Sequence, residues 1–154
     1  MQSIKLIVSL ILSFSAAAIG NLATIPNIPT WYASLEKPFF NPPNWLFGPV
    51  WTLLYILIGI SFYLIWTLKT KKSKATVYAI FFSQLALNAL WSIVFFGLHS
   101  LWGGLIVIMT LLINIGVLIH YFNRLKPLAS YLLIPYLAWV SFATCLNLAL
   151  ALMN

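Results

Sequence analysis

Long, uninterrupted apolar runs constrain this chain more than any other feature of its sequence. Five such runs cover approximately residues 4–22, 46–68, 75–98, 101–122 and 129–153. A bilayer core of about 30 Å is crossed by about 20 apolar residues of helix, so each run is long enough to span a membrane. The runs do not alternate between apolar and polar residues, which argues against a membrane β-barrel. The sequence therefore predicts an all-α integral membrane protein, a five-transmembrane-helix bundle forming one domain over residues 1–154.

Composition supports the same class. The chain is 63% hydrophobic and only 6% charged, whereas a soluble domain carries about 25% charged residues. The polar side chains are too few to cover a water-facing surface, so lipid must solvate the exterior. With one acidic residue and one cysteine, carboxylate dyads, a Ser-His-Asp arrangement and an intrachain disulfide are excluded. The two histidines have no second ligand at a suitable spacing, so neither a metal site nor an intrinsic cofactor is predicted.

The distribution of lysine and arginine predicts the orientation of the bundle. Lys37, beside the only acid Glu36, is the one basic residue on its side of the membrane. The positive-inside rule then puts the N-terminus in the cytoplasm, and the first loop and the C-terminus outside, in a bacterial-type inner membrane. The basic run at 68–74 is thus a topology signal and not a nucleic-acid site, although anionic-lipid contact is compatible with it. The basic residues of the opposite side are Lys5, Lys69, Lys71, Lys72, Lys74, Arg124 and Lys126.

The first apolar run has two interpretations. A basic start, an apolar centre and small residues after it are typical of a cleaved signal peptide. The same small residues, with Ala16 and Gly20 at small-xxx-small spacing, equally suit close packing of a retained helix.

Polar and aromatic residues recur on one face of three predicted helices. Taken singly, each of these residues is explained by a hydrogen bond between helices or by anchoring at the lipid headgroups. Taken together, they favour a cavity for a large, flat, mostly apolar ligand, since such a pocket needs apolar walls with a few polar groups. The residues are Trp51 and Tyr55 in the second run, Gln84, Asn88, Trp91 and Phe95 in the third, and Tyr136, Trp139, Ala143 and Asn147 in the fifth. Pro135 should kink the fifth helix and free the carbonyl of Tyr131.

The first loop, predicted at residues 23–45, is the only link long enough to form structure of its own. Its prolines stiffen it, because each proline fixes φ and disfavours helix at the preceding residue. It also carries aromatic side chains. The segment is therefore either a rigid lid over the mouth of the bundle or an anchor lying on the headgroups. The candidate lid residues are Trp31, Lys37, Pro42, Pro43 and Trp45.

The stretch WYASLEKPFFNPPNWLFGPVWTLLY, residues 31–55, resembles the signature of the TspO/MBR family, the translocator proteins once called peripheral benzodiazepine receptors. LNALWSIVFFG and LLIPYLAWVSFATCLN resemble further parts of that family, and the resemblance covers the whole chain. It implies a five-helix bundle, often a homodimer, that binds porphyrins such as protoporphyrin IX and benzodiazepine-type ligands. The pocket is expected between the helices, beneath the first loop.

The resemblance also implies roles for matching residues. Trp51 and Trp139 would be pocket aromatics, Tyr32 and Asn88 would face the ligand, and Ala143 would be a small residue at the pocket. The candidate ligand-binding set combines these positions with the polar stripes. It consists of Tyr32, Trp51, Tyr55, Gln84, Asn88, Trp91, Tyr136, Trp139, Ala143 and Asn147.

Three functions are compatible with this resemblance: a tetrapyrrole receptor or sensor, a transporter of porphyrin or related amphipathic molecules, and light-dependent porphyrin degradation through Trp51 and Trp139. Five helices cannot form two equal inverted repeats, which argues against secondary active transport. No acid–base pair is present for ordinary enzymatic turnover. Asn147 is followed by LALALMN, without the tyrosine and basic residue of the animal cholesterol-recognition pattern. Sterol binding is therefore not expected, and a bacterial member is favoured.

Overall fold

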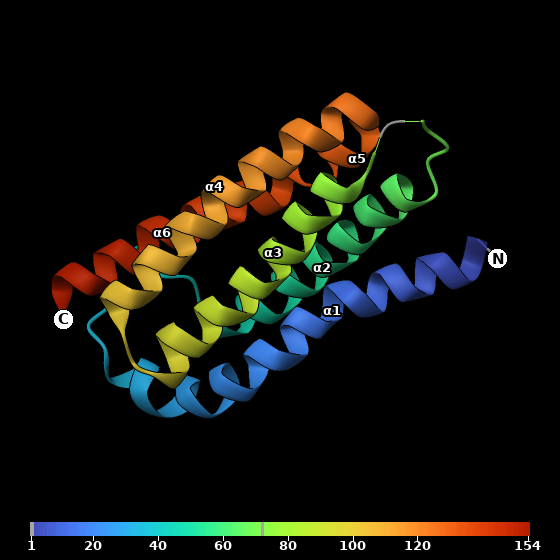
Figure 1. Ribbon diagram of the computed structural model, residues 1–154. Helices are drawn as coiled ribbons and strands as arrows, with labels where there is room; N and C mark the ends of the chain where they lie inside the picture. The colour runs from blue at the N-terminus through green and yellow to red at the C-terminus, as the bar shows by residue number, and fades with distance from the viewer. Residues whose placement is uncertain (1, 72) are drawn as a thin grey trace.

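The protein is an elongated bundle of long helices that run up and down beside one another (Figure 1). The computed structural model describes residues 2–71 and 73–154, so Lys72 of the predicted basic run lies outside the described residues. The long helices are α1 Gln2–Asn27, α2 Asn44–Trp66, α3 Ala75–Ser92, α4 Leu101–Leu125 and α6 Ile134–Met153. Three short elements complete the fold: the π-helical turns η1 Ile28–Tyr32 and η2 Ile93–Gly97, and α5 Pro127–Tyr131.

The short elements extend the long helices. η1 continues α1, η2 continues α3, and α5 precedes α6. Within the described residues, five segments are therefore long enough and apolar enough to cross a membrane. They are residues 2–32, 44–66, 75–97, 101–125 and 127–153. The predicted all-α bundle of five spanning helices is confirmed.

The first helix corrects the sequence prediction most strongly. Helix was expected to end near Leu22, with a long loop beginning at Ala23, but α1 and η1 together continue to Tyr32. Only residues 33–43 then link η1 to α2, so much of the predicted loop is helical. α1 contacts both α2 and α3.

Side-chain hydrogen bonds accompany the helix past Pro26. A proline inside a helix removes one main-chain donor, and in a membrane the freed groups need other partners. Thr24 Oγ1, Asn27 Nδ2 and Thr30 Oγ1 each donate to the carbonyl four residues earlier, at 3.0, 2.8 and 3.0 Å. The accepting carbonyls are those of Gly20, Ala23 and Pro26, and the carbonyl that Pro26 frees, at Leu22, is not among them.

Pro135 has a larger effect than the predicted kink. The fifth segment is broken into α5 and α6, with Leu132 and Leu133 in a turn between them. Pro135 lies in the first turn of α6, where its missing N–H needs no partner within the helix. Ser61 Oγ donates to the carbonyl of Ala129 at 2.6 Å, which attaches α5 to α2.

Small residues set how closely α1 approaches its neighbours. A Cβ added at Gly59 of α2 would lie 2.8 Å from Leu10 Cδ2, and one at Gly20 would lie 2.9 Å from Ser92 Oγ of α3. Ser13 Oγ also donates to the carbonyl of Tyr55 at 2.6 Å. The part of α1 near its N-terminus is therefore held against α2, and the part near Gly20 against α3.

Candidate ligand-binding site

A cavity of about 510 Å³ lies within the half of the bundle nearest to residues 33–43. Its size falls within the range of about 300–1,000 Å³ that is usual for small-molecule pockets. α1, η1, α2, α3, η2 and α6 all contribute to its wall. The lining residues are Phe14, Ala16, Ala17, Gly20, Asn21, Thr24, Ile25, Ile28, Tyr32, Asn44, Trp45, Phe47, Gly48, Trp51, Thr52, Tyr55, Asn88, Trp91, Ser92, Phe95, Phe96, Trp139, Ala143, Leu146, Asn147 and Leu150.

The wall is aromatic and uncharged. Among the described residues that line the cavity, none carries a formal charge. The polar groups that it does present are amides, hydroxyls and indole N–H groups. Such a wall accommodates a flat apolar body and orients it through a few neutral hydrogen bonds.

Four buried side chains form a hydrogen-bonded chain that starts at the cavity. Tyr55 Oη donates to Asn88 Oδ1 at 2.5 Å, and Asn88 Nδ2 donates to Tyr136 Oη at 3.0 Å. Tyr136 Oη in turn donates to Gln84 Oε1 at 2.9 Å. The chain joins α2, α3 and α6, and it fixes the floor of the cavity, because both functional groups of Asn88 are already engaged.

The three tryptophans of the predicted stripes all reach the cavity, but their surroundings differ. Trp51 is stacked on Tyr55, with ring centroids 5.6 Å apart. Trp91 Nε1 donates to Asn147 Oδ1 at 3.1 Å. Trp139 Nε1 is buried and has no hydrogen-bond partner in the described part of the chain. A buried indole N–H normally finds an acceptor, so this group is an exception. It has almost no accessible surface, so a ligand in the cavity would contact the ring of Trp139 and not its N–H.

The cavity opens sideways between α1 and α2. Several lining residues on these two helices are exposed at the surface of the bundle, including Asn21, Ile25, Gly48 and Thr52. Toward the other end of the bundle the same helices are in close contact at Gly59. The opening therefore leads to the surrounding lipid as well as to the end of the bundle.

Most residues of the predicted ligand-binding set line the cavity. Two members of the same helix faces do not: Gln84 and Tyr136 are fully buried beneath it and act through Asn88. The residues that do line it are Tyr32, Trp51, Tyr55, Asn88, Trp91, Trp139, Ala143 and Asn147.

The predicted lid contributes less to the cavity wall than expected. Of its five residues only Trp45 lines the cavity, and Trp45 belongs to α2. Trp31, Lys37, Pro42 and Pro43 lie outside the wall. Residues 33–43 instead close the end of the bundle.

Hydrogen bonds hold residues 33–43 in place from both sides. Tyr32 Oη donates to Asn41 Oδ1 at 2.7 Å. Lys37 Nζ donates to the carbonyls of Ala33 and Leu35, and lies 5.0 Å from the centroid of the Tyr32 ring.

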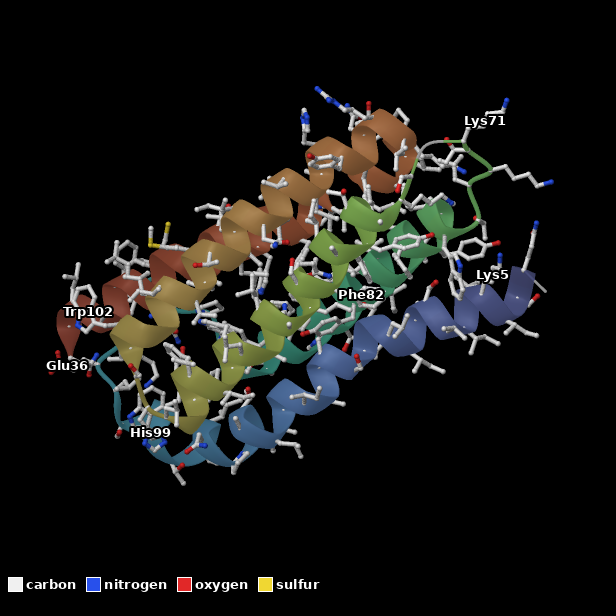
Figure 2. The ribbon with its side chains drawn as sticks, in the orientation of Figure 1. Lys5, Glu36, Lys71, Phe82, His99 and Trp102 are labelled. Atoms are coloured by element: carbon white, nitrogen blue, oxygen red, sulfur yellow. The ribbon has the colours of Figure 1, made fainter. Side chains whose placement is uncertain are left out.

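The second attachment is at Glu36. Its main-chain N–H donates to Asn154 Oδ1 at 2.9 Å, and Asn154 Nδ2 donates back to its carbonyl at 3.0 Å. Figure 2 shows Glu36 at the end of the bundle where the chain terminates.

Sequence reasoning missed the contribution of α1. Asn21 and Thr24 lie near the end of the first apolar run, three residues apart and thus on nearby faces of a helix. These two polar residues were the available signal, but the run was expected to end at Leu22, between them. Phe47 and Phe96 were also missed, because an apolar side chain in an apolar run does not show whether it lines a cavity or packs against a neighbouring helix.

Comparison with known proteins decides the family. Residues 7–153 match the TspO/MBR family. The chain belongs to the TspO/MBR family. A "Tryptophan-rich protein TspO" of Archaeoglobus fulgidus is 47% identical over 154 residues, covering 100% of this chain and 99% of that protein.

Further TspO/MBR relatives come from animals and bacteria. The human "Translocator protein" is 40% identical over 119 residues, covering 76% of this chain and 70% of the human protein. A "Tryptophan-rich sensory protein" of Cereibacter sphaeroides is 37% identical over 117 residues, covering 76% of this chain and 72% of that protein. TspO/MBR membership and the five spanning segments together establish a multi-pass membrane protein.

Proposed function

We propose that this TspO/MBR protein is a membrane receptor that binds a flat tetrapyrrole such as protoporphyrin IX in the cavity between its helices. The observation that carries the proposal is the cavity itself: about 510 Å³, walled by aromatic side chains that include Trp51, Trp91 and Trp139. A tetrapyrrole presents a broad apolar face to such a wall.

The uncharged wall dictates how such a ligand lies. A carboxylate buried without a counter-charge is strongly disfavoured, so the propionates of a porphyrin must stay outside the wall. The sideways opening between α1 and α2 leaves room for them near the membrane surface. In this orientation the ring system is buried and the acidic edge is solvated.

A receptor fits the geometry better than a transporter. The cavity occupies one half of the bundle, and below it α1, α2, α3 and α6 are closed by packed side chains and by the chain from Tyr55 to Gln84. The name of the Cereibacter sphaeroides relative, a tryptophan-rich sensory protein, agrees with this choice, whereas that of the human relative, a translocator protein, agrees with the alternative.

The test is a titration of the purified protein with protoporphyrin IX in the dark, followed by quenching of tryptophan fluorescence. Trp139→Leu keeps an apolar side chain and removes the aromatic ring, so affinity should fall about 5-fold, as for one lost aromatic contact of about 1 kcal/mol. Trp102→Leu is the matched control, because Trp102 is 56% exposed and does not line the cavity. Non-saturable quenching, or equal affinity of both variants, would contradict the proposal.

The tryptophans of the wall support light-dependent porphyrin degradation as a second candidate. Trp51, Trp91 and Trp139 all line the cavity, so a bound porphyrin would lie beside an oxidisable indole. Porphyrin absorbs the light itself and would supply the reactive chemistry. Illumination of the bound complex in air distinguishes the two functions: loss of porphyrin absorbance that requires Trp51 or Trp139 indicates degradation, whereas stable absorbance indicates a receptor.

A further inference from the structure

Most of the basic side chains that the structure describes lie at the end of the bundle opposite to the cavity, and Lys37 is the exception. Figure 2 shows Lys5 and Lys71 together at this end and Glu36, the only acidic residue, at the other. Lys69 and Lys74 belong to the same link between α2 and α3. This end therefore attracts anions and lacks an acid of its own to neutralise it.

Two lysines at this end have different roles. Lys74 Nζ donates to the carbonyls of Ile65, Trp66 and Leu68 at 2.8, 3.2 and 2.6 Å, which uses all three of its N–H groups to close the end of α2. Burial, and then the charge of Lys5, lower the pKa of Lys74 below its usual value.

The N–H groups of Lys5 remain available to a partner from outside the described residues. Its Nζ lies 5.5 Å from the centroid of the Trp66 ring and makes no hydrogen bond to any described residue. The charge of Lys5 disfavours the charged form of Lys74, which lies nearby. An anion placed at Lys5 would relieve this repulsion.

An apolar groove of about 150 Å³ begins beyond these lysines, between α1 and α3. Its wall includes Leu12, Ser15 and Ile19 from α1, and Phe82, Leu85 and Ala86 from α3. Figure 2 shows Phe82 between the ribbons of α3 and α1, and its side chain is 45% exposed. The groove is thus open to the bilayer.

The groove and Lys5 are aligned along α1. Lys5, Leu12 and Ile19 follow one another at seven-residue spacing, so they share a face of the helix. With a rise of about 1.5 Å per residue, Leu12 lies about 10 Å beyond Lys5. The headgroup layer of a leaflet is about 5–8 Å thick, so a charge at Lys5 and a chain at Leu12 match the two ends of a lipid.

We propose that this groove holds an anionic glycerophospholipid from the leaflet at the basic end, with its phosphate on Lys5 and one acyl chain between α1 and α3. A zwitterionic lipid carries a quaternary ammonium that the nearby lysines repel, so the site discriminates by charge. A free phosphate would gain nothing from the groove, and the alignment of charge and groove therefore selects a lipid.

The test is native mass spectrometry of the full chain with phosphatidylglycerol and phosphatidylcholine of identical acyl chains. The expected result is preferential binding of phosphatidylglycerol. Lys5→Gln should weaken it about 5-fold, since one basic residue near an anionic surface contributes about 1 kcal/mol. Lys37→Gln, the matched change at the opposite end, should leave lipid binding unchanged.

A second variant tests the groove. Ala86 is exposed to the lipid side, so Ala86→Leu narrows the groove without filling the core, and it should weaken both lipids about equally. Equal effects of Lys5→Gln and Lys37→Gln, displacement of the lipid by millimolar glycerol phosphate, or unchanged binding to Ala86→Leu would each overturn the proposal. So would an Ala86→Leu protein whose dimer population falls while lipid binding stays constant, because the groove would then belong to a second copy of the chain.

Discussion

Asn88 illustrates how single polar residues are used in this membrane protein. Its carbonyl oxygen accepts from Tyr55 and its amide nitrogen donates to Tyr136, so one side chain on α3 joins α2 to α6. An amide without a hydrogen-bond partner costs free energy inside a membrane. The hydroxyl groups of Tyr55 and Tyr136 therefore stabilise the fold by bonding to Asn88. The residues that shape the cavity floor are the same residues that hold the helices together.

Tyr55→Phe tests this connection at the scale of one hydroxyl group. The change leaves Asn88 Oδ1 without its donor, and a hydrogen bond between membrane helices contributes about 0.6–1.7 kcal/mol. We expect unfolding in a denaturing detergent titration to become easier by about 1 kcal/mol. Tyr131→Phe is the control, since Tyr131 is 63% exposed. Equal stability of the two variants would contradict a stabilising role for the hydrogen bond from Tyr55 to Asn88.

At the scale of the element, α1 contacts α2 through glycine instead of interdigitated large side chains. A Cβ at Gly59 would lie 3.1 Å from the main-chain Cα of Leu10 and 3.2 Å from the carbonyl oxygen of Ser9. A helix main chain cannot move aside as a flexible side chain can. The distance between α1 and α2 therefore depends on the absence of a side chain at Gly59.

Gly59→Ala and Gly116→Ala form a matched pair of variants. Replacing glycine by alanine inside a helix is intrinsically favourable by about 1 kcal/mol. A Cβ at Gly116 meets nothing within 4 Å, so Gly116→Ala should keep this gain. Gly59→Ala should instead destabilise by about 1–2 kcal/mol, the usual cost of overpacking. Thermal unfolding in detergent measures both, and a stabilised Gly59→Ala would show that α1 and α2 can separate freely.

The attachment of residues 33–43 to α6 is also tested at the scale of the element. Asn154→Ala removes both hydrogen bonds to the main chain of Glu36. We expect amide hydrogen exchange across residues 33–43 to become about 5-fold faster or more, as for two partly exposed bonds that together contribute about 1 kcal/mol. Exchange in α4 serves as the internal reference and should not change. An unaltered exchange rate at residues 33–43 would assign their order to Tyr32 and Asn41 alone.

At the scale of the whole molecule, charge is separated along the bundle axis. The basic links and the N-terminal helix start lie at one end, and Glu36 and Lys37 lie at the other (Figure 2). In a bacterial-type inner membrane the basic end is expected to face the cytoplasm. The cavity would then lie in the half of the bundle nearest to the outer surface.

Cysteine labelling tests this orientation. In a Cys145→Ala background, Ser73→Cys should react with a membrane-impermeant maleimide only in inverted vesicles, and Ser34→Cys only in right-side-out vesicles. Both serines are exposed, so the reagent can reach either position. The reverse pattern would show that the positive-inside rule does not orient this bundle.

The sequence by itself determined the membrane environment, the five spanning segments and the helix faces that carry polar groups. Run length and composition suffice for this, because a chain with so few charged residues can expose its surface only to lipid. Helical spacing put Trp51, Asn88 and Trp139 each on the polar face of its own helix. That these faces meet at one pocket was implied by the resemblance to the TspO/MBR family.

Only the tertiary structure decided which of these residues meet the cavity and where α1 ends. Gln84 shares a face with Asn88, yet it lies beneath the floor, because spacing fixes direction and not how closely neighbouring helices approach. Helix continues past Pro26 because tertiary packing supports it: α1 lies against α3 at Gly20 and contacts η2 beyond it. Trp139 lacks a partner for its indole N–H for a similar reason: the position of every possible acceptor depends on the packing of the other helices.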